Sequence, residues 1–111
     1  DGRAWISGRP KDLIISGGYN VYPKEVELVL DELPGITESA VIGVPHPDFG
    51  EGVAAICTGA GDEAAIIAAA RKQLAAYKAP KRVVFVTDLP RNTMGKVQKN
   101  VLRDRYKALF G

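Results

Sequence analysis

Two short β-rich runs, at residues 39–44 and 53–58, constrain the fold of this chain more than any other feature of its sequence. Both runs are bounded by turn residues, and Pro45-His46-Pro47-Asp48 connects them. This pattern predicts two strands joined by a short connection. A third run, Val83–Val86, is continuously apolar over the length of a strand, which predicts a central strand of the sheet.

Three segments are expected to form helices. The first begins at Pro23, where a missing N–H costs nothing, and it stops at Pro34-Gly35. The second follows Asp62, a good N-cap residue, and ends near Ala76, while the third covers residues 97–109. The first helix has an apolar face at helical spacing, made of Val26, Val29, Leu30 and Leu33.

Residues 5–7 and 13–15 add two short strands joined around residues 8–12. The order β-β-α-β-β-α-β-α then predicts an α+β fold, a two-layer domain with helices packed on a small mixed β-sheet and a short two-stranded hairpin before it. A chain of 111 residues fits one domain. Its hydrophobic content of 46% is that of a globular protein rather than a disordered one.

Charge and residue counts exclude several functional classes. The net charge of +2 does not indicate a nucleic-acid or membrane partner, and no apolar run has the length of a membrane span or a signal peptide. Cys57 is the only cysteine, so we expect a core thiol in a reducing compartment, with the cytoplasm as the location. His46 is the only histidine, so we expect no metal site of the His-cluster type. The chain opens on Asp1, and we expect it to be part of a longer protein.

Residues 90–97, Pro-Arg-Asn-Thr-Met-Gly-Lys-Val, place one lysine on a turn directly before the last predicted helix. Gly95 frees the backbone there, and Lys96 is held near a rigid element with its ammonium group free to reach outward. A flexible point charge of this kind suits phosphate or carboxylate oxygens. Taken alone, the motif is more typical of a solvated surface lysine than of a functional one.

A second motif agrees with the first in order and spacing. Residues 8–27 contain Gly17-Gly18-Tyr19 and Asn20-Val21-Tyr22-Pro23-Lys24-Glu25, and residues 41–52 extend the pattern. Together the segments resemble the C-terminal domain of the adenylate-forming superfamily, which comprises acyl-CoA synthetases, luciferases and nonribosomal-peptide adenylation domains. The malonyl-CoA synthetases are the most similar group. The resemblance covers almost the whole chain, and it leaves out the family's large N-terminal domain.

The resemblance implies a two-step reaction and a set of residues for its first step. A carboxylate attacks the α-phosphate of ATP, which binds with Mg²⁺, to give an acyl-adenylate and pyrophosphate, and the thiol of coenzyme A then displaces AMP. Lys96 is implied as the catalytic lysine of the first step. Lys11 is implied as the hinge, near residues 9–12, about which the domain rotates between two poses. Arg9 is implied to lie near the ribose of the nucleotide, with a surface charge at a strand end as the alternative.

The second step has its own implied residues. Gly17, Gly18 and Tyr19 match the loop that lines the pantetheine tunnel, where glycines allow the close approach of a slender chain. Tyr77, Lys78 and Lys81 match a segment in which a ring and a basic residue meet the nucleotide of coenzyme A, and Phe49 borders the same site. A half-buried tyrosine at a helix end is the structural alternative for Tyr77.

The implied partners are the chain's own N-terminal domain, ATP, coenzyme A and a small carboxylic acid, with no nucleic acid and no membrane. The acid is expected to be malonate on sequence likeness alone. We also expect Lys96 to be a modification site for a protein lysine acetyltransferase and deacetylase, because its charge carries its role. Arg91, Lys99 and Arg103 are expected to offer the acetyltransferase a basic recognition surface.

Two other functions remain open from the residues. The chain is also compatible with a non-catalytic α+β binding module, and a large upstream domain in the full reading frame would favour the enzyme. Residues 59–64 follow a strand and open a helix, with Asp88 downstream, which mimics a dinucleotide-binding fingerprint. Asp62 and Glu63, however, place negative charge where the helix would hold pyrophosphate. A titration with NADH would decide this alternative.

Overall fold

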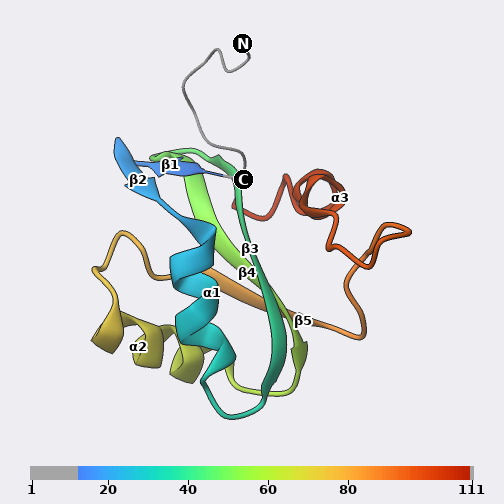
Figure 1. The fold of residues 1–111 in the computed structure, drawn as a ribbon. Helices are drawn as coiled ribbons and strands as arrows, with labels where there is room; N and C mark the ends of the chain where they lie inside the picture. Colours follow the sequence, from blue (N-terminus) through green and yellow to red (C-terminus); the bar gives the residue numbers. More distant parts are fainter. Residues whose placement is uncertain (1–12, 111) are drawn as a thin grey trace.

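The structure, a computed structural model, describes residues 13–110. Five strands and three helices lie within this range, and they include a strand at Tyr19–Val21 that was not predicted (Figure 1). The predicted strand at residues 5–7, together with Arg9 and Lys11, lies outside the described residues. The elements are β1 (Ile14–Ser16), β2 (Tyr19–Val21), α1 (Pro23–Asp31), β3 (Ile36–His46), β4 (Gly50–Gly59), α2 (Glu63–Gln73), β5 (Arg82–Val86) and α3 (Lys99–Arg105).

The predicted pair of strands forms the middle of a mixed sheet. β3 and β4 pair antiparallel over almost their whole length, with Ile42 opposite Ala54. β1 pairs antiparallel with β2 and touches the start of β4, while β5 pairs parallel with β4. Val83–Val86 is therefore not a central strand, because β4 is its only strand partner in the described part of the chain. Its apolar run reflects cover by α2 and by the segment after the strand rather than pairing on two sides.

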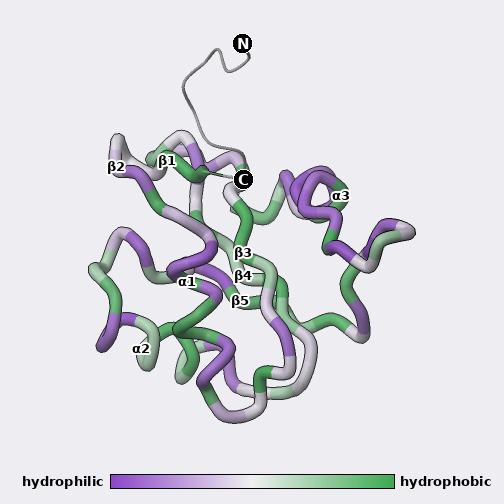
Figure 2. Tube along the Cα trace, viewed as in Figure 1, coloured by the Kyte–Doolittle hydropathy of each residue, from purple (hydrophilic) through white to green (hydrophobic). Residues whose placement is uncertain are grey.

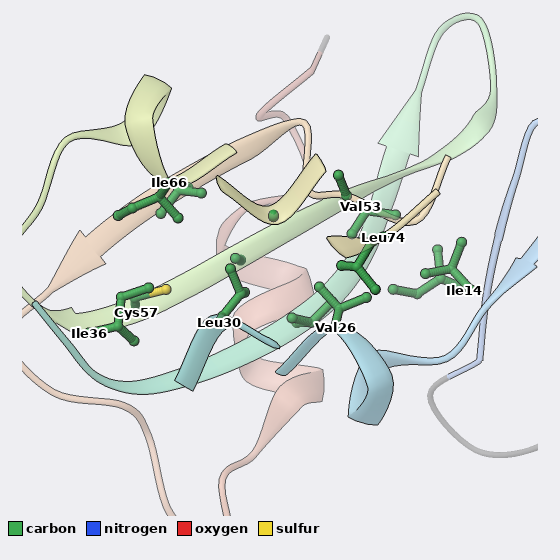
Figure 3. Packing of buried hydrophobic residues seen from close by; sticks show 14 residues of the cluster. Ile14, Val26, Leu30, Ile36, Val53, Cys57, Ile66 and Leu74 are labelled. Atoms are coloured by element: carbon green, nitrogen blue, oxygen red, sulfur yellow. The ribbon is translucent and has the colours of Figure 1, made fainter. Parts of the chain in front are cut away.

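Side chains of β3 and β4 alternate between two cores, one on each face of the sheet. α1 and α2 cover the first face, where Val53, Cys57 and Val83 pack with Leu30 and Ile66 (Figure 3). The second face is covered by α3 through Leu102, which packs against a cluster completed by Ala40, Ile42, Val44, Ala54, Ile56 and Leu89. The predicted packing of helices on a sheet is confirmed, and the short α3 adds cover on the opposite face.

Local chemistry explains where the helices begin and end. Pro23 occupies the first turn of α1, and the Asp62 side chain accepts a hydrogen bond from the Ala65 N–H at 2.9 Å at the start of α2. Gly35, with φ +88°, turns the chain after α1. α2 ends at Gln73 rather than near Ala76, because the backbone of Leu74 is extended and its side chain enters the core.

Cys57 is a buried residue of the first core, as expected from its place in an apolar strand. Burial raises the pKa of its thiol to about 12, which keeps the thiol protonated and unreactive at neutral pH. None of the helices within residues 13–110 combines the length and the hydropathy that a membrane span requires.

We expect Glu63→Gln to destabilise the chain by about 0.5–1 kcal/mol at pH 7, a small value because the carboxylate is 38% exposed. The Glu63 carboxylate accepts hydrogen bonds from the Val83 N–H at 2.8 Å and from Arg82 Nε at 2.7 Å, and so ties α2 to β5. The first of these bonds is the main reason why the pKa of Glu63 is lowered from 4.5. Its contribution is therefore complete above about pH 4.5 and lost as pH falls through the lowered folded-state pKa.

Urea unfolding of the parent chain and the variant at pH 7 and pH 3 would measure this effect, with Glu32→Gln as the matched control on an exposed carboxylate at the end of α1. The difference between parent and Glu63→Gln should shrink at pH 3. A difference of the same size at both pH values would contradict the ionic origin of the bond.

Candidate functional site

The loop at residues 91–97 is built around the side chain of Asn92. Its Oδ1 accepts hydrogen bonds from the backbone N–H groups of Met94 and Lys96, at 2.9 Å and 3.0 Å. The Asn92 backbone closes the loop from the other side, since its N–H donates to the carbonyl of Lys96 at 3.0 Å. Gly95 has φ +81°, a conformation that favours glycine. The backbone of Lys96 is therefore fixed although its side chain is exposed.

The two limbs of the loop are joined at its base. Arg91 and Val97 form a β-bridge, and the Gln98 N–H donates to the Pro90 carbonyl at 2.8 Å. This bridge holds Val97 in the loop, so α3 does not begin until Lys99. The helix ends at Arg105 and is therefore shorter than the predicted helix over residues 97–109. The Arg91 guanidinium donates to the Gly95 carbonyl at 3.0 Å and pairs with Glu38 of β3.

Lys96 lies beside a pocket of about 350 Å³ whose lining is mostly polar. An exposed ammonium group at the rim of a polar pocket is suited to bind anionic oxygens that another domain or a ligand presents. The pocket is lined by Asn92, Lys96, Val97, Gln98, Lys99, Asn100 and Arg103.

The expected basic recognition surface is largely neutralised within the domain. Lys99, expected to be exposed as part of that surface, is only 17% exposed and pairs with Glu27 of α1, with 2.7 Å between Nζ and Oε2. Arg91 pairs with Glu38. The expectation of a solvated Lys99 was wrong because helix periodicity does not report a carboxylate on another element.

The residues predicted for coenzyme A come together on a second face. Gly17 and Gly18 form the turn between β1 and β2, with φ of +60° and +85°. The Gly17 N–H donates to the Phe49 carbonyl at 2.9 Å. A Cβ on Gly17 would lie 3.2 Å from the Phe49 ring, so the close contact between hairpin and ring needs a glycine there.

Aromatic rings and lysines gather beside this turn, in what we call the ring patch, made of Tyr19, Phe49, Tyr77, Lys78 and Lys81. The rings of Tyr19 and Tyr77 lie 4.7 Å apart, and Tyr19 is 59% exposed. Lys78 Nζ lies 5.8 Å from the centre of the Tyr77 ring, and Lys81 Nζ lies 4.5 Å from that of Phe49. Three separate segments thus present flat apolar surface and positive charge together.

Two residues that support the ring patch were missed by sequence reasoning. Glu25 of α1 pairs with Lys78 at 3.1 Å, and this hydrogen bond raises the pKa of Lys78, which keeps the lysine charged. The His46 ring lies 4.6 Å from Phe49 and 4.9 Å from Phe110, so it supports Phe49 from behind. The position of Glu25 in the first turn of a helix does not indicate that it pairs with Lys78, which is far away in the sequence.

The two faces lie apart in the fold. Figure 1 shows the β1–β2 hairpin and the segment before β5 on one side of the molecule, and the loop before α3 on the other. Within residues 13–110, no group of three or more His, Cys, Asp or Glu side chains is placed to hold a metal ion.

The start of α2 argues against dinucleotide binding. Asp62 accepts the Ala65 N–H, and Glu63 binds Arg82 and the Val83 N–H. Carboxylates thus occupy the helix start that a pyrophosphate would need.

Comparison with known proteins gives consistent matches. The family model described as "AMP-binding enzyme C-terminal domain" matches residues 25–96. The long-chain-fatty-acid–CoA ligase FadD13 of Mycobacterium tuberculosis is 46% identical over 111 residues, which cover 97% of this chain and 22% of that protein. The crystal structure of apo MatB from Rhodopseudomonas palustris has a TM-score of 0.89 and 59% identity, covering 93% of this chain and 21% of MatB. The chain spans about a fifth of the length of the relatives it matches.

Proposed function

This chain belongs to the C-terminal domain family of AMP-binding enzymes, and we propose that it is the mobile C-terminal domain of an ATP-dependent, AMP-forming carboxylate–CoA ligase. One observation carries the proposal. An exposed lysine on a fixed loop lies on one face, and a patch of rings and lysines lies on another. Two faces with different chemistry suit a domain that serves two successive half-reactions in two orientations.

In the first half-reaction, the face with Lys96 closes over ATP and the carboxylic acid. A carboxylate oxygen attacks the α-phosphorus, the bond to pyrophosphate breaks, and negative charge shifts among carboxylate, phosphate and pyrophosphate oxygens. An ammonium group already in place stabilises that charge without reorganisation. The backbone of Lys96 is fixed, which limits the positions that its ammonium group can take. ATP and Mg²⁺ would be held mainly by the N-terminal domain.

In the second half-reaction, the ring patch faces the active site. The thiolate sulfur of coenzyme A attacks the acyl carbon, and AMP leaves with its phosphate. The β1–β2 turn would border the pantetheine arm, since glycines there admit a close backbone contact. Tyr19 and Tyr77 would stack on adenine, while Lys78 and Lys81 would pair with phosphates of coenzyme A.

Rotation between the two orientations would take place at Lys11, and Arg9 would lie near the ribose of the nucleotide. Both residues precede the described part of the chain, and both roles rest on the family resemblance. A hinge acts through backbone freedom at a few positions, so Lys11 needs no particular side-chain contact for this role.

We infer malonate as the carboxylic acid because the chain is 59% identical to MatB, a malonyl-CoA synthetase, and 46% identical to the long-chain ligase FadD13. The full-length protein, assayed with ATP, coenzyme A and a panel of acids, should release AMP and form acyl-CoA fastest with malonate. Acetate and a long-chain fatty acid are the comparison substrates. Formation of ADP, or of no acyl-CoA with any acid, would overturn the ligase function, and a preference for a long-chain acid would overturn only the malonate assignment.

We further propose that Lys96 is regulated by a protein lysine acetyltransferase and deacetylase. Acetylation removes the positive charge of the lysine, so the side chain can no longer bind phosphate oxygens as a cation. The exposed loop leaves the side chain accessible. The single buried cysteine agrees with the reducing cytoplasm as the place of action.

A further inference from the structure

Few side chains of the helix that follows Lys96 are buried, although Tyr106, Leu109 and Phe110, which come directly after it, also pack against the second core. Figure 2 shows α3 as largely hydrophilic, and Leu102 is its only fully buried residue. A helix of 7 residues does not gain stable structure from propensity alone, so its position depends on tertiary contacts. Its first residue, Lys99, comes three positions after Lys96. Any shift of the start of α3 would therefore move the lysine loop.

Glu27 provides a second anchor at that place. Glu27 is on α1, which covers the opposite face of the sheet from α3, and Figure 1 shows β3 running between the two helices. The Glu27 carboxylate pairs with Lys99 Nζ at 2.7 Å, and both side chains are only 17% exposed. The same Oε2 atom accepts the Val41 N–H at 2.9 Å.

The Val41 N–H explains why a carboxylate fits here. β3 is an edge strand, paired only with β4 within residues 13–110, so its outward N–H groups need other acceptors. Glu27 satisfies one of them and reaches around the edge to Lys99. One carboxylate thus joins α1, β3 and the start of α3 in a place where solvent screens the charges less than at the surface.

The other limb of the loop is also fixed to β3, through Arg91 and Glu38. Both limbs therefore rest on the same strand, Arg91 directly and Lys99 through Glu27. Between them, the Asn92 side chain fixes the backbone of Lys96. Hydrogen bonds fix the loop internally, and two ion pairs join it to the rest of the domain, of which the Glu27 contact is the more buried. Val97 of the loop also packs against the second core.

We propose that Glu27 is a positioning residue for Lys96. By neutralising Lys99 and binding the edge of β3, it sets the place of the lysine loop relative to the sheet. The proposal rests on the proposed adenylation role of Lys96. Misplacing a catalytic group by about 1 Å can lower a rate by about 100-fold, so a contact this close to the loop has a measurable effect on the first half-reaction.

The test uses the full-length enzyme and measures the two half-reactions separately. Glu27→Gln keeps the shape and an acceptor for the Val41 N–H but removes the charge. We expect kcat for acyl-adenylate formation to fall about 10-fold or more, with thioester formation from supplied acyl-adenylate within about twofold of the parent. Lys99→Met should give the same loss, and the double variant should be no worse than either single one, because both remove one interaction.

Asp104→Asn is the matched control. It removes an ion pair between Asp104 of the same helix and Lys107, which follows the helix, and their side chains are 81% and 70% exposed. We expect both half-reactions of this variant to stay at the parent rate. Lys99→Arg, which retains the charge, should keep most of the adenylation rate, a result that a purely apolar packing role of Lys99 would not give.

The outcomes separate the two proposals. Equal loss of both half-reactions in Glu27→Gln, or no loss in either, would overturn the positioning role. If Lys96→Ala, measured in parallel, left adenylation intact, the proposed function itself would fail. If the rate of acyl-adenylate formation fell in Lys96→Ala but not in Glu27→Gln, only the positioning role of Glu27 would be rejected.

Discussion

Lys96→Ala in the full-length protein should lower the rate of acyl-adenylate formation by about 10²–10³-fold. The substitution removes the one exposed ammonium group that the loop at residues 91–97 presents, while the backbone bonds of the loop do not involve the side chain. Thioester formation from supplied acyl-adenylate should stay within about threefold of the parent rate, because we propose that this step uses the ring patch instead of Lys96. Pyrophosphate exchange and acyl-CoA release measure the two steps.

Lys72→Ala serves as the control, since Lys72 is an exposed lysine in the last turn of α2 that belongs neither to the loop at residues 91–97 nor to the ring patch. It should leave both rates unchanged. Enzymatic acetylation of Lys96 should reproduce the alanine variant and be reversed by a deacetylase. A loss of the same size in both half-reactions of Lys96→Ala would contradict the assignment of one step to each face. Full adenylation activity after Lys96 acetylation would reject the regulatory proposal.

The main elements of the fold were predictable because their signals are local. Pro23 and Asp62 mark helix starts through their own backbone and side-chain chemistry, and both do so in the structure. The runs at residues 39–44 and 53–58 form the long β3–β4 pair. In contrast, β2 is only three residues long and follows two glycines, so nothing local identified Tyr19–Val21 as a strand. Its structure comes from pairing with β1.

Some residues of the candidate site could likewise be predicted from the sequence, and others could not. The family resemblance identified Lys96 and the members of the ring patch, and the structure brings Tyr19, Tyr77 and Lys78 together. The carboxylates that hold these cations were not predictable. Glu25 and Lys78 are 53 residues apart, as are Glu38 and Arg91. Local sequence patterns give no information about pairs of residues so far apart in the chain. Lys99 was predicted to be exposed because its pairing with Glu27 could not be foreseen from the sequence.

Loss of the ring pair should have the second large effect, this time on coenzyme A. In the full-length enzyme, Tyr77→Leu combined with Tyr19→Ala should raise KM for coenzyme A by about 10-fold or more, because stacking of a base on an aromatic ring contributes about 1–3 kcal/mol. Leucine is chosen at position 77 because Tyr77 also packs against the first core, and an apolar side chain preserves that contact. Steady-state kinetics with varied coenzyme A would measure the change.

Tyr106→Leu is the matched control, since Tyr106 is a half-buried tyrosine that packs against the second core beside α3. It should change stability but not KM for coenzyme A. The adenylation rate of the double variant should equal that of the parent, because we propose that the ring patch faces away from the active site in that step. If the double variant bound coenzyme A as the parent does, the rings would serve only the packing of the β1–β2 hairpin against the segment before β5. If it instead lost adenylation, the two faces would not act in separate steps.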